Sequence, residues 1–128
     1  MNLYFLMPRP SSRGDELLNA AAPFVSGGRV EVLFDLKGFE TRMRRPKDRP
    51  SVAIIWDPTG ADLREIGSWK DLLAGVRTLL VLHDQHKGTI ALAHKLLPAY
   101  IAYIDDAISD IVSVLGRLSE TREEGAGT

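Results

Sequence analysis

Short apolar runs alternate with longer amphipathic segments along most of the chain. Five such runs are rich in β-branched, aromatic and leucine side chains and are too short to be helices, so each predicts a β-strand. The strands are expected at residues 3–7, 30–34, 52–56, 78–82 and 100–104.

The segments between these runs carry apolar residues at spacings of three and four, which predicts amphipathic helices. The helices are expected at residues 15–25, 36–45, 61–74, 86–97 and 107–118. In the last of them Ile108, Ile111, Val112, Leu115 and Leu118 fall on one face. Glycine and proline residues punctuate the connections from helix to strand, where helices commonly end.

A strand–helix unit repeated five times predicts a parallel sheet with helices on both faces and right-handed crossovers. The expected fold class is therefore α/β, a doubly wound (βα)5 sheet of five parallel strands in the order 2-1-3-4-5. In this order the strands at 3–7, 52–56 and 78–82 are interior, and they are the continuous apolar runs expected of strands buried on both faces. The predicted edge strands are more polar, with Glu31 in one and two tyrosines in the other.

Length and composition indicate one folded domain. The chain has 128 residues, of which 45% are hydrophobic and 26% charged, as in ordinary globular proteins. We expect the domain to cover residues 1–118. Residues 119–128 lose the apolar periodicity and are expected to form a polar, flexible tail.

The charge balance and the absence of cysteine narrow the expected partners and location. Sixteen basic and seventeen acidic residues leave a net charge of −1, so no overall field draws the chain to nucleic acid or to an anionic membrane. No apolar run approaches the roughly 20 residues that span a bilayer. A chain without cysteine has no thiolate metal site, and it fits a reducing compartment. We expect a cytoplasmic protein.

Ligands of open α/β sheets bind beyond the carboxyl ends of the strands, where the strand order reverses. This rule places Met7–Arg9 beside Asp57–Gly60 and exposes the carboxylate of Asp57 at the sheet edge. The sequence Asp-Pro-Thr-Gly is also a turn signature, in which an aspartate bonds to nearby backbone amides. Both interpretations of Asp57 remain open at this point.

The chain resembles the receiver domain of two-component response regulators over nearly all of residues 1–118. The resemblance rests on the order of the elements, on the segment Val-Glu-Val-Leu-Phe-Asp-Leu-Lys-Gly-Phe-Glu-Thr-Arg-Met, and on the strand that ends at Asp57. It implies a flavodoxin-like fold, a bacterial signalling role and a phospho-acceptor position at Asp57.

Three departures from the receiver pattern change the implied chemistry. Receivers hold magnesium with two acidic residues after the first strand, whereas this chain has Met7-Pro8-Arg9. Receivers place Ser or Thr after the fourth strand and lysine after the fifth, where this chain has His83 and Tyr103. The resemblance therefore implies a pseudo-receiver, a non-enzymatic module without a metal or cofactor that acts through a protein partner of a signalling pathway. Its pocket residues are expected to be Arg9, Thr59, His83, Asp84 and Tyr103 around Asp57.

The missing metal suggests one physical substitute. Arg9 or Arg13 is hypothesised to lie near Asp57 and to supply a guanidinium that pairs with its carboxylate.

A second class of function is carried by the segment Ser11, Ser12, Arg13 and Gly14. Hydroxyls, a cation and a glycine before a predicted helix could bind an anion, which would indicate a flavodoxin-like protein for flavin or another phosphate-bearing ligand. A plain helix cap from Ser11, Ser12 or Asp15 explains the same residues more simply. Likewise the segment from His83 to His86 is better explained as a polar loop than as a metal site.

Two surfaces are candidate partner sites. The first is a dense cluster of cations without a DNA-binding motif: Arg42, Arg44, Arg45, Lys47 and Arg49. This composition favours a solvated surface that pairs with an acidic partner over a phosphate site. The predicted helix at 86–97 is apolar around much of its circumference. Exposed apolar residues there would form an interface, and receivers commonly self-associate through this helix, the last strand and the last helix. The expected interface residues are Ile90, Leu96, Leu97, Tyr100 and Tyr103. The alternative interpretation is that the leucines of this helix are buried and pack a short helix against the core.

Overall fold

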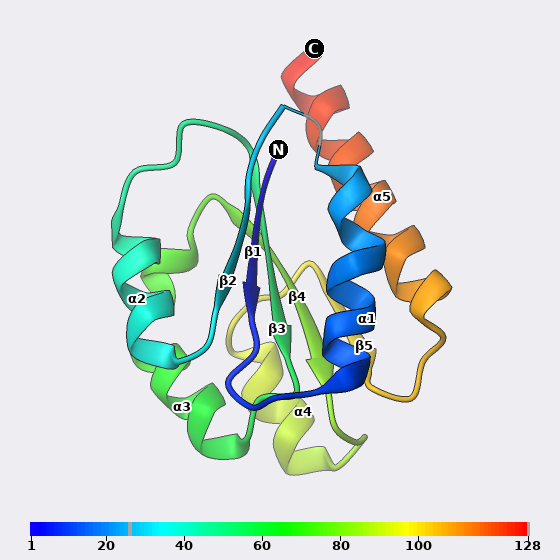
Figure 1. Cartoon of the computed structure of the whole chain (residues 1–128). Coiled ribbons are helices and arrows are strands. Elements are labelled where there is room, and N and C mark those ends of the chain that lie inside the picture. The colour runs from blue at the N-terminus through cyan, green and yellow to red at the C-terminus, as the bar shows by residue number, and fades with distance from the viewer. Residues whose placement is uncertain (26, 128) are drawn as a thin grey trace.

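The protein is a five-stranded parallel sheet with helices on both faces (Figure 1). The computed structural model describes residues 1–25 and 27–127, with side chains for 1–25 and 27–119. The strands are β1 (Asn2–Leu6), β2 (Val30–Leu33), β3 (Ser51–Trp56), β4 (Val76–Leu82) and β5 (Tyr100–Tyr103). All neighbours pair in parallel, in the order β2-β1-β3-β4-β5. The predicted fold class and strand order are confirmed.

The helices divide between the two faces of the sheet. They are α1 (Ser12–Ala21), α2 (Leu36–Arg44), α3 (Gly60–Ser68), α4 (Lys87–His94) and α5 (Ile108–Gly127), with short 3-10 helices η1 (Ala22–Phe24) and η2 (Lys70–Leu73). Helices α1 and α5 cover one face, and α2, α3 and α4 cover the other (Figure 1). Every helix is therefore packed on one side against strands.

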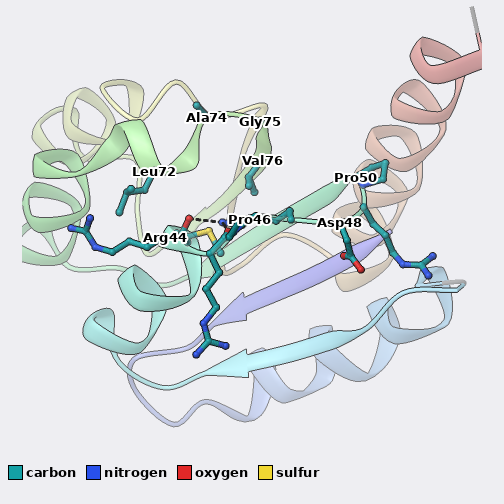
Figure 2. A pocket seen from close by; sticks show the side chains of 12 residues that line it. Arg44, Pro46, Asp48, Pro50, Leu72, Ala74, Gly75 and Val76 are labelled. Atoms are coloured by element: carbon teal, nitrogen blue, oxygen red, sulfur yellow. Dashed lines mark hydrogen bonds between the residues drawn. The ribbon is translucent and has the colours of Figure 1, made fainter.

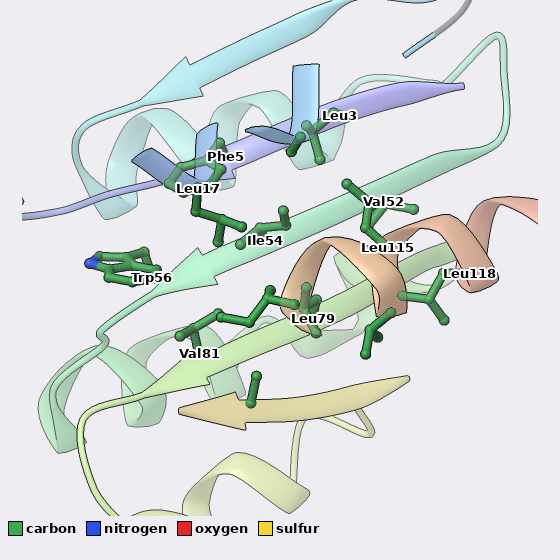
Figure 3. Packing of buried hydrophobic residues seen from close by; sticks show 14 of the residues in the cluster. Leu3, Phe5, Leu17, Val52, Ile54, Trp56, Leu79, Val81, Leu115 and Leu118 are labelled. Atoms are coloured by element: carbon green, nitrogen blue, oxygen red, sulfur yellow. The ribbon is translucent and has the colours of Figure 1, made fainter. Parts of the chain in front are cut away.

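Alternate residues of the central strands feed two separate cores. Leu3 and Phe5 of β1 point to the face covered by α1 and α5, where Leu17 and Leu115 meet them (Figure 3). Tyr4 points to the other face. All residues of β1 and β3 are buried, whereas all residues of β2 are half-buried. The expectation that the central strands are buried on both faces, and that β2 lies at an edge, is confirmed.

The ends of several helices differ from those predicted. Helix α1 begins three residues early because the Ser11 hydroxyl accepts a hydrogen bond from the Gly14 amide at 3.0 Å, which caps the helix. The predicted helix at 61–74 divides at Trp69, whose φ of −130° interrupts α3 before the 3-10 turn η2.

Two other helix ends differ. Helix α4 ends at His94, short of Leu97, whose backbone is left-handed with φ +52° and which is followed by Pro98, a residue that cannot continue a helix. The backbone of α5 continues as helix to Gly127, past the predicted domain end at residue 118. The division of the chain into a domain and a polar tail stays a prediction, since side chains from residue 120 onward lie outside the described part. Within the described ranges, no helix is both long enough and apolar enough to span a membrane.

Candidate functional site

The carboxyl ends of β1, β3 and β4 place the expected site residues together at one sheet edge. Asp57 follows β3 directly, and its amide donates to the Val81 carbonyl at 2.8 Å, which extends the pairing of β3 with β4 by one residue. Its φ is +50°, in the left-handed region, which aspartate tolerates better than most residues. The Asp57 side chain is 33% exposed, so it is accessible at this edge.

His83, directly after β4, is the neighbour of the Asp57 carboxylate. Its Nδ1 lies 3.4 Å from Asp57 Oδ1, close enough for an ion pair when the imidazole is protonated. Two-thirds of the His83 side chain is exposed, so water and salt screen this pair and it contributes little to stability. The pair places an imidazole beside the carboxylate where receivers carry a hydroxyl.

Arg9, in the connection after β1, reaches the β3–α3 connection. One guanidinium nitrogen donates to the Asp57 carbonyl oxygen, and the other lies 3.2 Å from Asp62 Oδ2. Arg9 therefore lies beside Asp57 as expected, but its carboxylate partner is Asp62. The hypothesised pairing of Arg9 with the Asp57 side chain is not what the structure contains.

Asp62 is held in place by a capping box at the start of α3. The Thr59 hydroxyl accepts from the Asp62 amide at 3.0 Å, and Asp62 Oδ2 accepts from the Thr59 amide at 2.9 Å. Thr59, expected in the pocket, thus serves as the helix cap. Sequence reasoning missed Asp62, although the Thr-x-x-Asp spacing after a turn was the signal that could have found it.

Arg13 is bound at a different place from the one hypothesised. Its guanidinium donates to the carbonyl oxygens of Ile104 at 2.9 Å and Asp106 at 2.7 Å, which connects the start of α1 to the β5–α5 connection. Both carbonyls lie beyond β5, so Arg13 gives no cation to Asp57.

Ser11 and Gly14, two other residues of the predicted anion site, have partners within the chain. The Ser11 hydroxyl caps α1. Gly14 lies so close to its neighbours that a Cβ there would be 2.6 Å from Met7 Sδ and 3.2 Å from Trp56 Nε1. Ser12 is exposed as the first residue of α1. These contacts account for the residues through helix capping and packing, without a ligand.

Asp84 and Tyr103 are turned to local contacts. Asp84 Oδ1 accepts from the His86 amide at 2.9 Å, and His86 Nδ1 in turn accepts from the Gly88 amide at 3.1 Å, which caps α4. The Tyr103 amide donates to Asp106 Oδ2 at 2.9 Å, and its half-buried ring packs on the core under α2, α3 and α4. Within the side chains that the structure describes, no hydrogen bond or ion pair joins either residue to Asp57.

The donor set at this edge does not fit a magnesium ion. Magnesium prefers carboxylate oxygens, and the position after β1 offers the guanidinium of Arg9 and the thioether of Met7. Within residues whose side chains are described, no three of His, Asp and Glu are grouped as metal ligands would be. The Asp57 carboxylate has the His83 imidazole as its neighbour, and the nearby acid Asp62 is paired with Arg9.

The predicted interface around α4 and β5 is partly exposed. Leu97 is 82% exposed and Tyr100 44% exposed, while Ile90 and Tyr103 are half-buried. Leu96 is only 5% exposed and packs into the core, so its assignment to an interface is wrong. Because α4 ends at His94, the chain turns and sends Leu96 inward and Leu97 outward. Leu97 also has a φ of +52°, which is costly for a bulky side chain.

The basic cluster lies at the opposite edge of the sheet, in and after α2. Arg42 pairs with Glu31 at 2.6 Å and stacks over the Tyr4 ring at 5.0 Å from its centroid. The hydrogen bond to Glu31 raises the pKa of Arg42 above its ordinary value. Arg44 pairs with Glu40 at 2.7 Å. Two of the five cations thus have carboxylate partners.

These features define the class of fold: a doubly wound sheet of order 2-1-3-4-5 with an exposed aspartate at the end of β3 has the architecture of response-regulator receiver domains. No protein-family model and no curated protein sequence matches the chain.

Solved structures share the fold at low sequence identity. A protein from Burkholderia pseudomallei described as pilus assembly-related has a TM-score of 0.72 at 17% identity, over 94% of this chain and 90% of that one. A CheY-like response regulator protein from Mesorhizobium loti has a TM-score of 0.62 at 16% identity, over 89% and 94%. The signal receiver domain described as that of the response regulator NarL from Mycobacterium tuberculosis has a TM-score of 0.59 at 15% identity, over 93% and 95%.

Proposed function

We propose that the chain is a receiver-like signalling module that acts through protein–protein contacts, without magnesium-dependent phosphorylation of Asp57. The observation that carries this proposal is the placement of Arg9. Phosphoryl transfer to an aspartate requires cations that neutralise the phosphoryl oxygens. Here Arg9 stands where receivers place acids that hold magnesium, and its guanidinium is already bound to the Asp57 carbonyl and to Asp62.

The contacts of Arg9 also hold the edge in one arrangement. They connect the end of β1 to the start of α3, across the connection that contains Asp57. Arg13 makes an equivalent connection from α1 to the segment after β5. Both support a module whose conformation is set without a covalent signal.

The contact surface of the module is proposed to be the face formed by α4, β5 and α5, with Leu97 and Tyr100 at its centre. These are two of the four exposed large hydrophobic residues among the described side chains. A left-handed, exposed leucine lowers stability, and such costly residues tend to be kept where they serve a function. The face fits either a homodimer or a protein partner in a signalling pathway.

The comparisons support this assignment of class. Two neighbours are response regulator domains, and one is described as pilus assembly-related. Partners are therefore worth seeking among the components of an appendage assembly as well as among signalling proteins.

An amide NMR titration with magnesium, and then with magnesium and beryllofluoride, tests the absence of aspartyl phosphorylation. Beryllofluoride mimics an aspartyl phosphate, so a working acceptor would give saturable shifts around Asp57 that vanish in Asp57→Asn. We expect the wild type and Asp57→Asn to respond alike, without saturation. Saturable shifts confined to the wild type would overturn the proposal. Light scattering on the same samples reports whether the chain self-associates.

A further inference from the structure

A groove opens at the amino-terminal edge of the sheet, opposite to Asp57. Its volume is about 500 Å³, and it lies between the α2–β3 connection and the segment from η2 to β4 (Figure 2). Leu72, Ala74 and Val76 form one wall, and the two prolines Pro46 and Pro50 flank the other. Gly75 continues the first wall, and a Cβ built there meets no atom within 4 Å, so the groove is open above it.

The groove concentrates positive charge in a chain that is negative overall. Residues 42–49 hold five cations and one carboxylate. Glu31 and Glu40 pair with Arg42 and Arg44, so three cations and one carboxylate of this segment remain, in a chain whose net charge is −1. The carboxylate, Asp48, also lines the groove and offsets part of this charge. Its Oδ1 accepts from Asn2 Nδ2 at 3.2 Å, and the side chain is directed toward β1 (Figure 2).

Three of the cations that line the groove have no ionic partner. Among the side chains that the structure describes, no carboxylate lies within ion-pair distance of Arg45, Lys47 or Arg49. Lys47 donates to the Met43 and Arg45 carbonyls, and burial together with the charge of Arg42 lowers the pKa of Lys47 below its ordinary value. The groove is thus a region of positive potential with two exposed guanidinium groups at its rim.

We propose that this groove binds an acidic segment of a partner protein. The chemistry of the walls favours a polypeptide over a phosphate group. A phosphate site needs convergent N–H donors, and two of the five residues 46–50 are prolines, which have none. An apolar wall beside exposed arginines is instead typical of protein interfaces, where arginine is enriched and lysine and glutamate are depleted.

The groove is prepared for such a ligand. The prolines fix φ in the connection, and Lys47 binds two carbonyls at the end of α2, so little further ordering is needed when a segment binds. The site does not depend on the state of Asp57. Ala74, Gly75 and Val76 also line a neighbouring pocket that includes Leu97, so the groove adjoins one end of the face of α4, β5 and α5. It would give the module a contact surface at the end of the strands opposite to Asp57.

Fluorescence anisotropy with a labelled peptide that alternates Glu and Leu tests the proposal at low salt. We expect saturable binding that the double variant Arg45→Gln, Arg49→Gln weakens about tenfold. Ala74→Glu, which places a like charge on the apolar wall and keeps both arginines, is expected to weaken it similarly. The matched control Arg64→Gln, Lys87→Gln removes the same charge from exposed positions elsewhere, and its affinity is expected to stay within about twofold. Circular dichroism checks that each variant is folded.

Four results would overturn the proposal. The first is an absence of saturable binding up to about 1 mM peptide. The second is equal loss of affinity in the groove variant and the control, and the third is equal binding of a peptide with Lys in place of Glu. The fourth is tighter binding of inorganic pyrophosphate or of a short DNA duplex, lost in the same groove variants, which would make the ligand a phosphate. Light scattering adds one more discriminator: dimers that the peptide disperses would show that a second copy, and no partner protein, occupies the groove.

Discussion

The guanidinium of Arg9 lies 3.2 Å from the carboxylate of Asp62, 53 positions further along the chain. The same side chain also holds the Asp57 carbonyl. Two connections that follow different strands are thereby joined at the sheet edge where receivers carry out their chemistry. The Arg9–Asp62 pair therefore has a structural role at this edge, and substitutions of the two residues can test it directly.

Arg9→Ala is expected to lower the free energy of unfolding by about 0.5–1 kcal/mol, because a half-exposed ion pair and one hydrogen bond to a carbonyl are lost. Chemical denaturation of Arg9→Ala, Asp62→Ala and the double variant measures the coupling. Asp62→Ala alone should cost more, since it also removes the capping box. Additive effects of the two substitutions would contradict a direct interaction.

Gly14→Ala is expected to lower stability by about 1–2 kcal/mol, because the added methyl meets buried Met7 and the Trp56 ring. Gly67→Ala is the matched control in another helix. A Cβ at Gly67 is 3.8 Å from Leu96, an ordinary contact, so alanine there should raise stability by about 0.5–1 kcal/mol through reduced backbone entropy. Thermal denaturation followed by tryptophan fluorescence compares the two. Stabilisation by both substitutions would show that Gly14 is not packed as described.

Leu97→Asn is expected to raise the free energy of unfolding by about 1 kcal/mol, because asparagine accepts the left-handed conformation that leucine adopts at a cost. Little packing is lost, since the Leu97 side chain is 82% exposed. If the face of α4, β5 and α5 mediates self-association, the same variant should weaken it, as measured by light scattering over a range of concentrations. A variant that is less stable than the wild type would show that Leu97 makes contacts which its exposure does not reveal.

Lys47 predicts a stability difference that depends on pH. Burial lowers its pKa in the folded state, so between that pKa and the ordinary lysine value the unfolded chain binds more protons. The stability contributed by Lys47 should therefore rise with pH in this alkaline range. Measured by urea denaturation, the wild type should gain stability relative to Lys47→Gln between neutral pH and about pH 10. The other lysines are common to both chains and cancel. A difference that stays constant or falls over this range would contradict the lowered pKa.

The pattern of apolar runs predicted the fold because the spacing of apolar residues along each segment shows whether it is an amphipathic helix or a buried strand. The continuous apolar runs that form β1, β3 and β4 can bury the side chains of both faces only between two layers of helices. Helix ends were predicted less well, since they depend on single contacts. The predicted helix at 86–97 stops early because of Pro98, and this places Leu96 inside and Leu97 outside.

The candidate site was predicted in its location but not in its pairing. The rule for parallel sheets brings Arg9, Asp57 and His83 to one edge without any knowledge of side-chain geometry. Which carboxylate Arg9 would meet depends on the capping box of Thr59 and Asp62, which holds the Asp62 carboxylate where Arg9 binds it. The basic groove could not be predicted, because its two walls come from connections that are adjacent only after the sheet has formed.

The two edges of the sheet differ in a way that limits association from strand to strand. The outer strand β2 carries Glu31, bound to Arg42 and within 3.9 Å of Arg29, so charged side chains guard this edge against strand addition. The opposite edge, β5, presents Tyr100 beside Leu97. Self-pairing of β5 edges uses the same edge of both copies and leaves only guarded β2 edges outside, so strand-to-strand association through β5 would end at two copies.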